Sequence, residues 1–494
     1  MGNDIEAARV AARAAFEQLL TEVDDGRAQR LWEFERQLWS SLLALGRALV
    51  VLFLVRQAGR PRPVVYLAGG KRYELEGHRT SSVATRFGKV DFTRPVGRLI
   101  EARGAAADLP VDRELGLCSG FSPAVVIAMT RLCAQLAFLP ARSMFQYFHE
   151  WTPSSRAVLR MVDAVGDEAR PFLDELPPPK NEGDVLVLEV DGGGAPTIRH
   201  QELRRRSRPH QKRPRGTTRR DRQRTKRKGT NRQRRRKGEK SKNAKVAFVG
   251  VLYSLRLTPT GYEGPINKRV IATFESHEAL FKWMQREAIK RGYGIKPCLF
   301  LADGSDHIWR LQKEYFPLAE VCIDWFHIIE KIWAAGECLH AEGSQQLTAW
   351  VKQMKSLLRR GHARTVISKL CVAHRRIPKT GPGNKGKRER LAKVIRHLFK
   401  QRHRLRYKEL RQRDLVIGTG AVEGAVRNLV RLRLDGPGMR WGRERSERIL
   451  KLRCILISNL WDEFSTHVAN LPSLKLRGAP LPATPYDATR KLAA

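Results

Sequence analysis

Two apolar runs that end alike constrain the fold of this chain more than any other feature of its sequence. Residues 185–190 (VLVLEV) lead into Asp191 and Gly192, and residues 297–302 (PCLFLA) lead into Asp303 and Gly304. Short apolar runs bounded by turn residues are typical of strands that lie buried inside a sheet. We therefore expect Asp191 and Asp303 to stand where two core strands end.

The segments around these runs predict a mixed α/β domain. Further strands are expected at 245–255, 268–274 and 320–325, and helices at 276–291 and 305–315. This order favours a ribonuclease H-like topology, which is a mixed five-stranded sheet flanked by helices. We expect this core to span residues 181–325 and 413–465. Two insertions would interrupt it, a basic one at 203–245 and a helical one at 326–412.

Residues 1–110 are expected to form a helical region with a small β part, which includes a strand-like piece at 64–67. The most apolar stretch, residues 42–55, is about 14 residues long and contains Arg47, so it is too short to span a bilayer and predicts a buried helix. The first residues lack the pattern of a signal peptide. The seven cysteines contain no CxxC pair, so a zinc ribbon or a disulfide framework has no support.

Residues 111–180 show helical periodicity. Helices are expected at 123–137, 141–150 and 154–168, with breaks at Leu139–Pro140 and Thr152–Pro153. Ser122 before Pro123 is typical of a helix N-cap. The three helices could form a helix-turn-helix that presents Arg156 and Arg160 to a DNA groove. The alternative is an ordinary helical bundle that supports the next domain. Residues 177–180 (PPPK) indicate a linker, and 466–494 a C-terminal tail.

The charge of the chain predicts a polyanionic partner. Lysine and arginine number 93 against 50 acidic residues, a formal net charge of +43. Nucleic acid is the usual partner of so basic a protein, and a membrane surface is the weaker alternative. Residues 204–245 alone hold 22 lysines and arginines against two acids. This tract has almost no apolar residues, and we expect it to contact DNA phosphates without distinguishing bases. A merely solubilising or targeting tract is the alternative.

The two aspartates suit phosphodiester chemistry. Two divalent ions about 4 Å apart can activate the attacking oxygen and stabilise the leaving oxygen. Mg²⁺ takes a few carboxylate oxygens and keeps several waters. Asp191 and Asp303 are candidates to hold such ions, and residues 192–194 (GGG) would let a DNA backbone approach. Taken singly, each aspartate could instead be an ordinary turn residue before glycine.

Three further residues are candidates for the same site. Glu423, in residues 418–424 (GTGAVEG), is expected on the first turn of a helix. It could instead only complement the helix dipole. Asp324 could be a fourth carboxylate, and His327 could hydrogen-bond the scissile phosphate or be a structural histidine. Neither a Walker A motif nor a dinucleotide-binding fingerprint is present.

Five segments together resemble the bacterial insertion-sequence DDE transposases of the ISKra type. They are residues 188–192 (LEVDG), 301–309 (LADGSDHIW), 323–327 (IDWFH), 418–424 (GTGAVEG) and 433–441 (RLDGPGMRW). The Asp324–His327 spacing is also similar to that of Mutator-like transposases. The resemblance covers roughly residues 110–465. It implies a ribonuclease H-like core, Asp191, Asp303 and Glu423 as the catalytic triad, and Mg²⁺-dependent cleavage and strand transfer. The long arginine-rich tract is a departure from the family.

These observations lead to several expectations about activity and partners. The active protein would bind two Mg²⁺ ions, or Mn²⁺ in their place, with Asp191, Asp303, Glu423 and Asp324 as ligands. Its partners would be double-stranded DNA at the terminal inverted repeats and the target, with a homodimer or larger assembly and no membrane. We expect a cytoplasmic, nucleoid-associated bacterial protein. The alternatives are a catalytically inactive or domesticated DNA-binding protein and a structure-selective nuclease of the same fold.

Overall fold

The computed structural model describes residues 2–26, 29–102, 107–198, 244–436 and 439–471, together with Leu474 and Leu476. Of the arginine-rich insertion expected at 203–245, only Ala244 and Lys245 lie within the described residues. The chain forms two compact units: Met1–Leu173 with Leu460–Ala494, and Asp174–Asn459. We describe each unit by itself.

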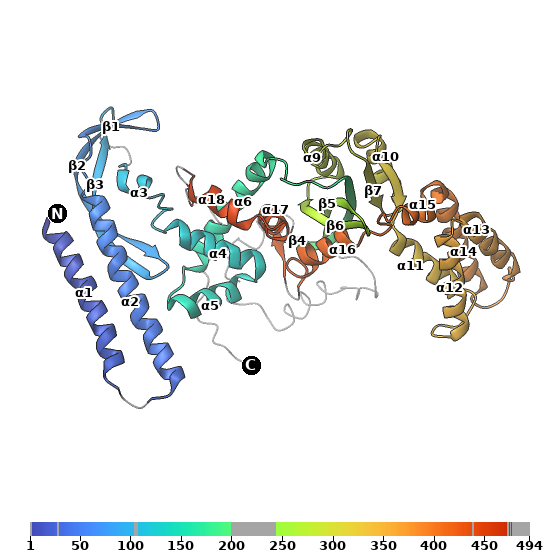
Figure 1. The fold of residues 1–494 in the computed structure, drawn as a ribbon, viewed down its shortest axis with the longest axis horizontal. Helices are drawn as coiled ribbons and strands as arrows, with labels where there is room; N and C mark the ends of the chain where they lie inside the picture. The colour runs from blue at the N-terminus through green and yellow to red at the C-terminus, as the bar shows by residue number, and fades with distance from the viewer. Residues whose placement is uncertain are drawn as a thin grey trace, which may run out of the picture. The chain divides into compact units, whose positions relative to one another are not determined.

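The first unit begins with a helical hairpin and a three-stranded antiparallel sheet (Figure 1). Its elements up to residue 99 are α1 (Gly2–Asp24), α2 (Leu31–Ala58), β1 (Val65–Ala68), β2 (Lys71–Thr85) and β3 (Gly88–Leu99). Gly69 and Gly70 both have positive φ in the turn that joins β1 to β2, a conformation that suits glycine. The β part is larger than expected, because β2 and β3 form one long hairpin.

The most apolar stretch is helical, as predicted. It is mostly not buried, however, and it belongs to a helix of 28 residues, so the prediction of a short buried helix was wrong. Residues 42–55 lie inside α2, but the Leu49 side chain is 50% exposed and that of Phe53 is 52% exposed. Three residues of α2 are buried: Leu43, and Leu54 and Ala58 near its end, which pack with Val83 of β2. Among the described residues, α2 is the one helix that is long and apolar enough to cross a membrane. That judgement rests on length and composition alone, and a core helix can meet the same criteria.

The rest of the first unit is helical. It contains α3 (Pro110–Glu114), α4 (Pro123–Gln135), α5 (Phe138–His149), α6 (Ser155–Glu175) and α18 (Trp461–Ala469), and α18 packs on α4. Ser122 caps α4 as predicted, because its hydroxyl accepts from the Val125 N–H. The break predicted at Leu139–Pro140 is wrong, since α5 begins at Phe138 and proline is tolerated in a first turn. Arg156 and Arg160 are exposed on α6, and the helix-turn-helix stays a prediction.

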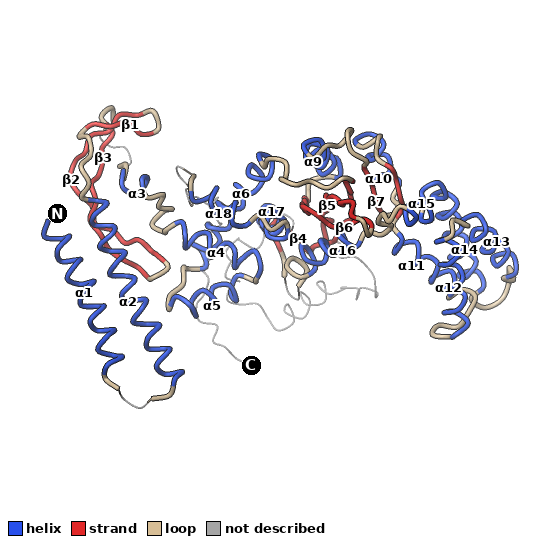
Figure 2. Tube along the Cα trace, in the orientation of Figure 1, coloured by secondary structure: helices blue, strands red, loops and turns tan. Residues whose placement is uncertain are grey.

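The second unit is built on a mixed sheet of five strands in the order β6-β5-β4-β7-β8. Figure 2 draws the strands in red and the helices around them in blue. The strands are β4 (Val185–Ile198), β5 (Ala244–Thr258), β6 (Gly261–Thr273), β7 (Cys298–Ala302) and β8 (Glu320–Ile323). β4, β5 and β6 pair antiparallel, whereas β4–β7 and β7–β8 pair parallel. A short strand, β9 (Trp441–Gly442), pairs with the far end of β4, which adds a sixth strand to the expected five.

Helices cover both faces of this sheet. Those next to the sheet are α9 (His277–Lys290), α10 (Asp306–Tyr315), α16 (Gly420–Val426), a π-helical turn η2 (Arg427–Arg431) and α17 (Arg443–Ile457). Successive residues of a strand face opposite sides. Gly250, which pairs with Val190, faces Met284 of α9, whereas Gly193 faces Val426 of α16. The two helices therefore lie on opposite faces of β4.

Residues 326–412, where a helical insertion is expected, lie in a group of packed helices between β8 and α16. That these helices are an insertion into the sheet domain stays a prediction. The group consists of α11 (Trp325–Gly336), α12 (Gln345–Arg359), α13 (Ala363–Arg376), α14 (Asn384–Gln401), a short 3-10 turn η1 (Arg402–Arg404) and α15 (Tyr407–Gln412). The result is a mixed α/β unit with a mixed sheet flanked by helices, consistent with the expected ribonuclease H-like topology.

Candidate metal centre

Asp191 lies within β4 and not at its end, so the expected position is corrected. The strand continues to Ile198 because Gly192 and Gly194 keep pairing with Phe248 and Val246 of β5. Gly192 and Gly193 pack against protein, on Val246 and Val426. A Cβ on Gly193 would stand 2.9 Å from Val426 Cγ1. Within the described part of the chain, one hydrogen bond reaches the Asp191 carboxylate, from the Gly192 N–H to Oδ1 (2.7 Å).

Asp303 follows the last residue of β7, as predicted. Its Oδ1 accepts from the Ser305 N–H (2.9 Å), which fixes the turn before α10. The insertion contacts this turn through α14. Gln401 Nε2 donates to the Gly304 carbonyl (3.2 Å), and a Cβ on Gly304 would lie 2.0 Å from His397 Cε1. Gly304 is therefore required by the close approach of a histidine that is 93 residues away in sequence.

Asp324 caps the N-terminus of α11 and joins three segments. Its Oδ2 accepts from the His327 N–H (2.7 Å) and lies 2.8 Å from His327 Nδ1, while its Oδ1 accepts from the Thr419 N–H (2.7 Å). The Asp324 N–H donates to the Ala302 carbonyl (2.9 Å), one residue before Asp303. The Asp324 side chain is fully buried. Its hydrogen bonds hold the pKa of its carboxyl below the usual value although burial opposes this.

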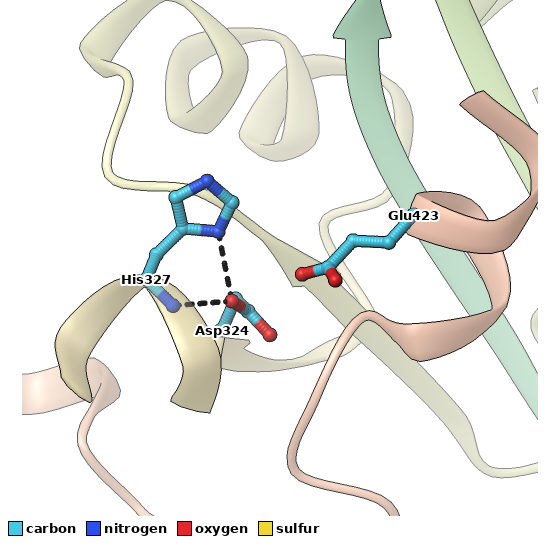
Figure 3. A group of neighbouring side chains, drawn as sticks. All are labelled: Asp324, His327 and Glu423. Atoms are coloured by element: carbon cyan, nitrogen blue, oxygen red, sulfur yellow. Dashed lines mark hydrogen bonds and ion pairs between the residues drawn. The ribbon is translucent and has the colours of Figure 1, made fainter. Parts of the chain in front are cut away.

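Glu423 lies on the first turn of α16, as the sequence predicts. Figure 3 shows its carboxylate directed toward the pair formed by Asp324 and His327. The Thr419 hydroxyl lies 3.4 Å from Glu423 Oε1 and is its hydrogen-bond donor. One potential ligand atom from each of Glu423, Asp324 and His327 lies within 4.8 Å of the others.

Glu189 is a residue of this site that the sequence analysis did not single out. It lies two residues before Asp191 on the same face of β4 and is fully buried. The Tyr253 hydroxyl donates to its Oε1 (2.7 Å), and the Val422 N–H donates to its Oε2 (2.8 Å). Burial, together with the charges of Asp324 and Glu423, raises the pKa of Glu189 to about 7, although its hydrogen bonds to Tyr253 and Val422 act in the opposite direction. The side chain anchors α16 to the sheet beside Glu423. An acid inside the run VLVLEV was the signal that could have revealed it.

The five predicted residues act on one another electrostatically. Burial raises the pKa of Asp191, and the negative charges of Asp303 and Asp324 add to this rise. Burial also raises the pKa of Glu423, with contributions from Asp324 and Asp191. The hydrogen bond to Asp324 raises the pKa of His327 to about 9, with further contributions from Asp191 and Asp303. The structure thus places several carboxylates around one imidazolium.

This donor set fits a hard divalent cation. Carboxylates that raise one another's pKa lack enough positive charge nearby, and a divalent ion would supply it. The available oxygens belong to Asp191, Asp303 and Glu423. Asp324 already accepts at both oxygens, and His327 Nδ1 is engaged with Asp324, which leaves the Nε2–H of the imidazolium as a donor that can reach an anionic oxygen.

Part of the chain matches the model of a known protein family. Residues 266–422 match the family model of the ISL3-type DDE transposases, whose description is "Transposase". No curated protein matches the chain. The matched segment runs from β6 to α16 and includes Asp303, Asp324 and His327, but it begins after Asp191 and ends one residue before Glu423. The match supports a DDE-type insertion-sequence transposase, a class that binds and cleaves DNA and generally uses divalent metals. The ISKra and Mutator-like relationships stay predictions.

Proposed function

We propose that this chain is the transposase of an insertion sequence and catalyses metal-dependent DNA cleavage and strand transfer. The observation that carries the proposal is geometric: Asp324, His327 and Glu423 each offer a potential ligand atom within 4.8 Å of the others. Asp191 on β4 and Asp303 after β7 lie near enough to this group for their charges to raise the pKa of His327. Asp191, Asp303 and Glu423 come from segments 112 and 120 residues apart in sequence. The family match over residues 266–422 supports the same class of activity.

In this proposal Asp191, Asp303 and Glu423 hold two Mg²⁺ ions, or Mn²⁺ in their place. When bound, the ions neutralise charge at the scissile phosphate and lower the pKa of the attacking water or hydroxyl. The chain's own residues supply position and charge. Asp324 orients His327 through Nδ1, and His327 Nε2 donates a hydrogen bond to a phosphate oxygen. Glu189 holds α16 so that Glu423 reaches the same site.

The partners in this proposal are the terminal inverted repeats of the element and the target DNA. Two DNA ends must be joined to one target, so we expect a homodimer or larger assembly on DNA. The arginine-rich tract would contact phosphates without distinguishing sequence. The place of action would be the cytoplasm of a bacterium, at the nucleoid.

The test is a strand-transfer assay on DNA fragments that carry the sequences flanking this reading frame, with Mg²⁺ or Mn²⁺ and with EDTA. We expect cleavage at the fragment ends and joined products only with metal. Cleavage at branched junctions without joining would indicate a structure-selective nuclease instead. Metal-independent binding with no cleavage under either ion would indicate an inactive or domesticated DNA-binding protein.

A further inference from the structure

A cavity of about 650 Å³ lies within the helical insertion, and none of its lining residues belongs to the candidate metal centre. Its walls are the turn between α12 and α13, the first turn of α13, and the segment from η1 to α15. Gly361 forms the turn with a φ of +83°, and a Cβ there would lie 3.4 Å from the stem of Lys408. The turn therefore packs closely on α15 and gives the cavity a defined wall.

The cavity is lined by cations. Arg360, Arg364, Arg402, Arg406 and Lys408 line it, against one acid, Glu409. Arg406 is ion-paired to Glu409 and to Glu320, so these charges offset one another. Among the described residues, no ion pair is found at the other four cations. Four positive charges around one concave wall repel one another, and a bound anion would relieve that repulsion.

Two local features favour an anion over simple solvation of these charges. The first turn of α13 holds no acid and has no side-chain cap, so its N–H groups are available at the cavity wall. The pKa of His403, another lining residue, is lowered by burial and by the charges of Arg404 and Arg402. The wall is thus a region of positive potential.

The cavity is joined to the Asp303 turn through one short segment. Arg402, which lines the cavity, directly follows Gln401, whose amide binds the Gly304 carbonyl beside Asp303. An anion held here would therefore be tied to the loop that carries a candidate metal ligand. We propose that this cavity binds a backbone phosphate of the substrate DNA, without contact to base edges. This inference rests on DNA being the substrate, as in the proposed function.

The experiment compares two triple variants of the full chain that lose the same charge. The cavity variant is Arg360→Ala/Arg364→Ala/Arg402→Ala. The control is Lys352→Ala/Lys369→Ala/Lys393→Ala, which removes three exposed cations on α12, α13 and α14 outside the cavity. Binding to a short mixed-sequence DNA duplex is measured by fluorescence anisotropy in EDTA over a series of salt concentrations. Thermal unfolding verifies that both variants are folded.

We expect the cavity variant to bind at least roughly tenfold more weakly than the control. The slope of log affinity against log salt should fall by about one for each phosphate that the variant no longer binds. Equal weakening in the two variants would overturn the proposal, because the cavity would then act only through net charge. If the triple variant does not fold, Arg364→Ala against Lys369→Ala tests the same difference.

The result can be separated from the fate of the proposed function. The wild-type chain is assayed in parallel for DNA cleavage with Mg²⁺ or Mn²⁺. A cavity-specific loss of binding together with no cleavage by the wild type would reject the transposase activity and keep the phosphate site. Cleavage by the wild type, together with equal binding by both variants, would keep the transposase activity and reject the phosphate site.

Discussion

The two sides of the candidate metal centre hold their acids in different ways. On the α11 and α16 side, both oxygens of Asp324 accept backbone or imidazole N–H groups, and the side chain is fully buried. On the sheet side, Asp191 and Asp303 each accept one bond from a nearby N–H of the described residues and are partly exposed. A carboxylate with free lone pairs can bind a metal, whereas one with its lone pairs engaged fixes its neighbours. In the proposed function we therefore expect Asp191 and Asp303, together with Glu423, to bind the metal, and Asp324 to position its neighbours.

The largest expected effect follows from neutralising the sheet-side acids. Asp191→Asn and Asp303→Asn should each lower the rate of DNA cleavage by at least about 10³-fold, because losing a metal ligand removes several kcal/mol of charge stabilisation. Stability without metal should be unchanged or higher, since the carboxylates repel one another. Single-turnover cleavage and urea unfolding measure the two quantities. Glu263→Gln, an exposed acid on β6, is the control, and a variant with full activity would remove that residue from the ligand set.

Asp324→Asn should behave in the opposite way, with a loss of stability that accompanies any loss of activity. Breaking the ion pair between the buried Asp324 and the partly exposed His327, and replacing one acceptor oxygen by an amide NH₂, costs roughly 2–3 kcal/mol. Urea unfolding of the metal-free protein measures this. An Asp324→Asn variant that is as stable as the wild type, but inactive, would instead favour Asp324 as a ligand.

Asp324→Asn should also change how the stability of the protein depends on pH. In the wild type the pKa of His327 is raised to about 9, so its contribution to stability is complete below pH 6.5 and is lost as pH rises through about 9. Without the Asp324 charge, the pKa of His327 should fall toward its ordinary value. Histidine NMR of the metal-free protein follows both titrations.

The sequence predicted the features of the fold and of the site that depend on local chemistry. The strands that precede Asp191 and Asp303, the capping of α4 by Ser122 and the place of Glu423 on a first helical turn follow from short-range patterns. It did not predict where β4 ends, because that depends on its pairing with β5, which lies beyond the arginine-rich insertion.

Long-range packing accounts for most of what the sequence did not reveal. The apolar face of α2 indicates a helix, but its burial depends on which elements lie against it. The approach of His397 to Gly304 joins two segments far apart in sequence, and no periodicity marks it. Glu189 is the one of these features that the sequence could have revealed, because an acid in a buried strand needs hydrogen-bond partners.

A smaller effect is expected where the insertion meets the sheet side. Gly304→Ala should destabilise the protein by about 1–3 kcal/mol, because the new Cβ would overlap the His397 ring and overpacking costs that much. Gly420→Ala is a matched control, since nothing lies within 4 Å of a Cβ there, and it should be neutral or slightly stabilising in α16. Thermal unfolding compares the two. Equal stability would mean that α14 can move away from the Asp303 turn without cost.

The smallest expected effect concerns His397 itself and tests whether α14 holds the sheet side. Burial lowers the pKa of His397 to about 4, and its Nε2 is buried with no hydrogen-bond partner among the described residues. The folded protein therefore binds fewer protons than the unfolded chain between about pH 4 and 6.5, and stability falls as pH falls through this range.

The ring is only half-buried, so solvent screening reduces the loss to about 1 kcal/mol or less. His397→Leu should lack this acid-dependent loss, and urea unfolding at pH 7 and pH 5 gives the difference between the two proteins. Parallel pH profiles would show that the contact with Gly304 does not depend on a neutral ring. A steeper wild-type profile would show that the insertion stays docked beside Asp303 only while His397 is uncharged.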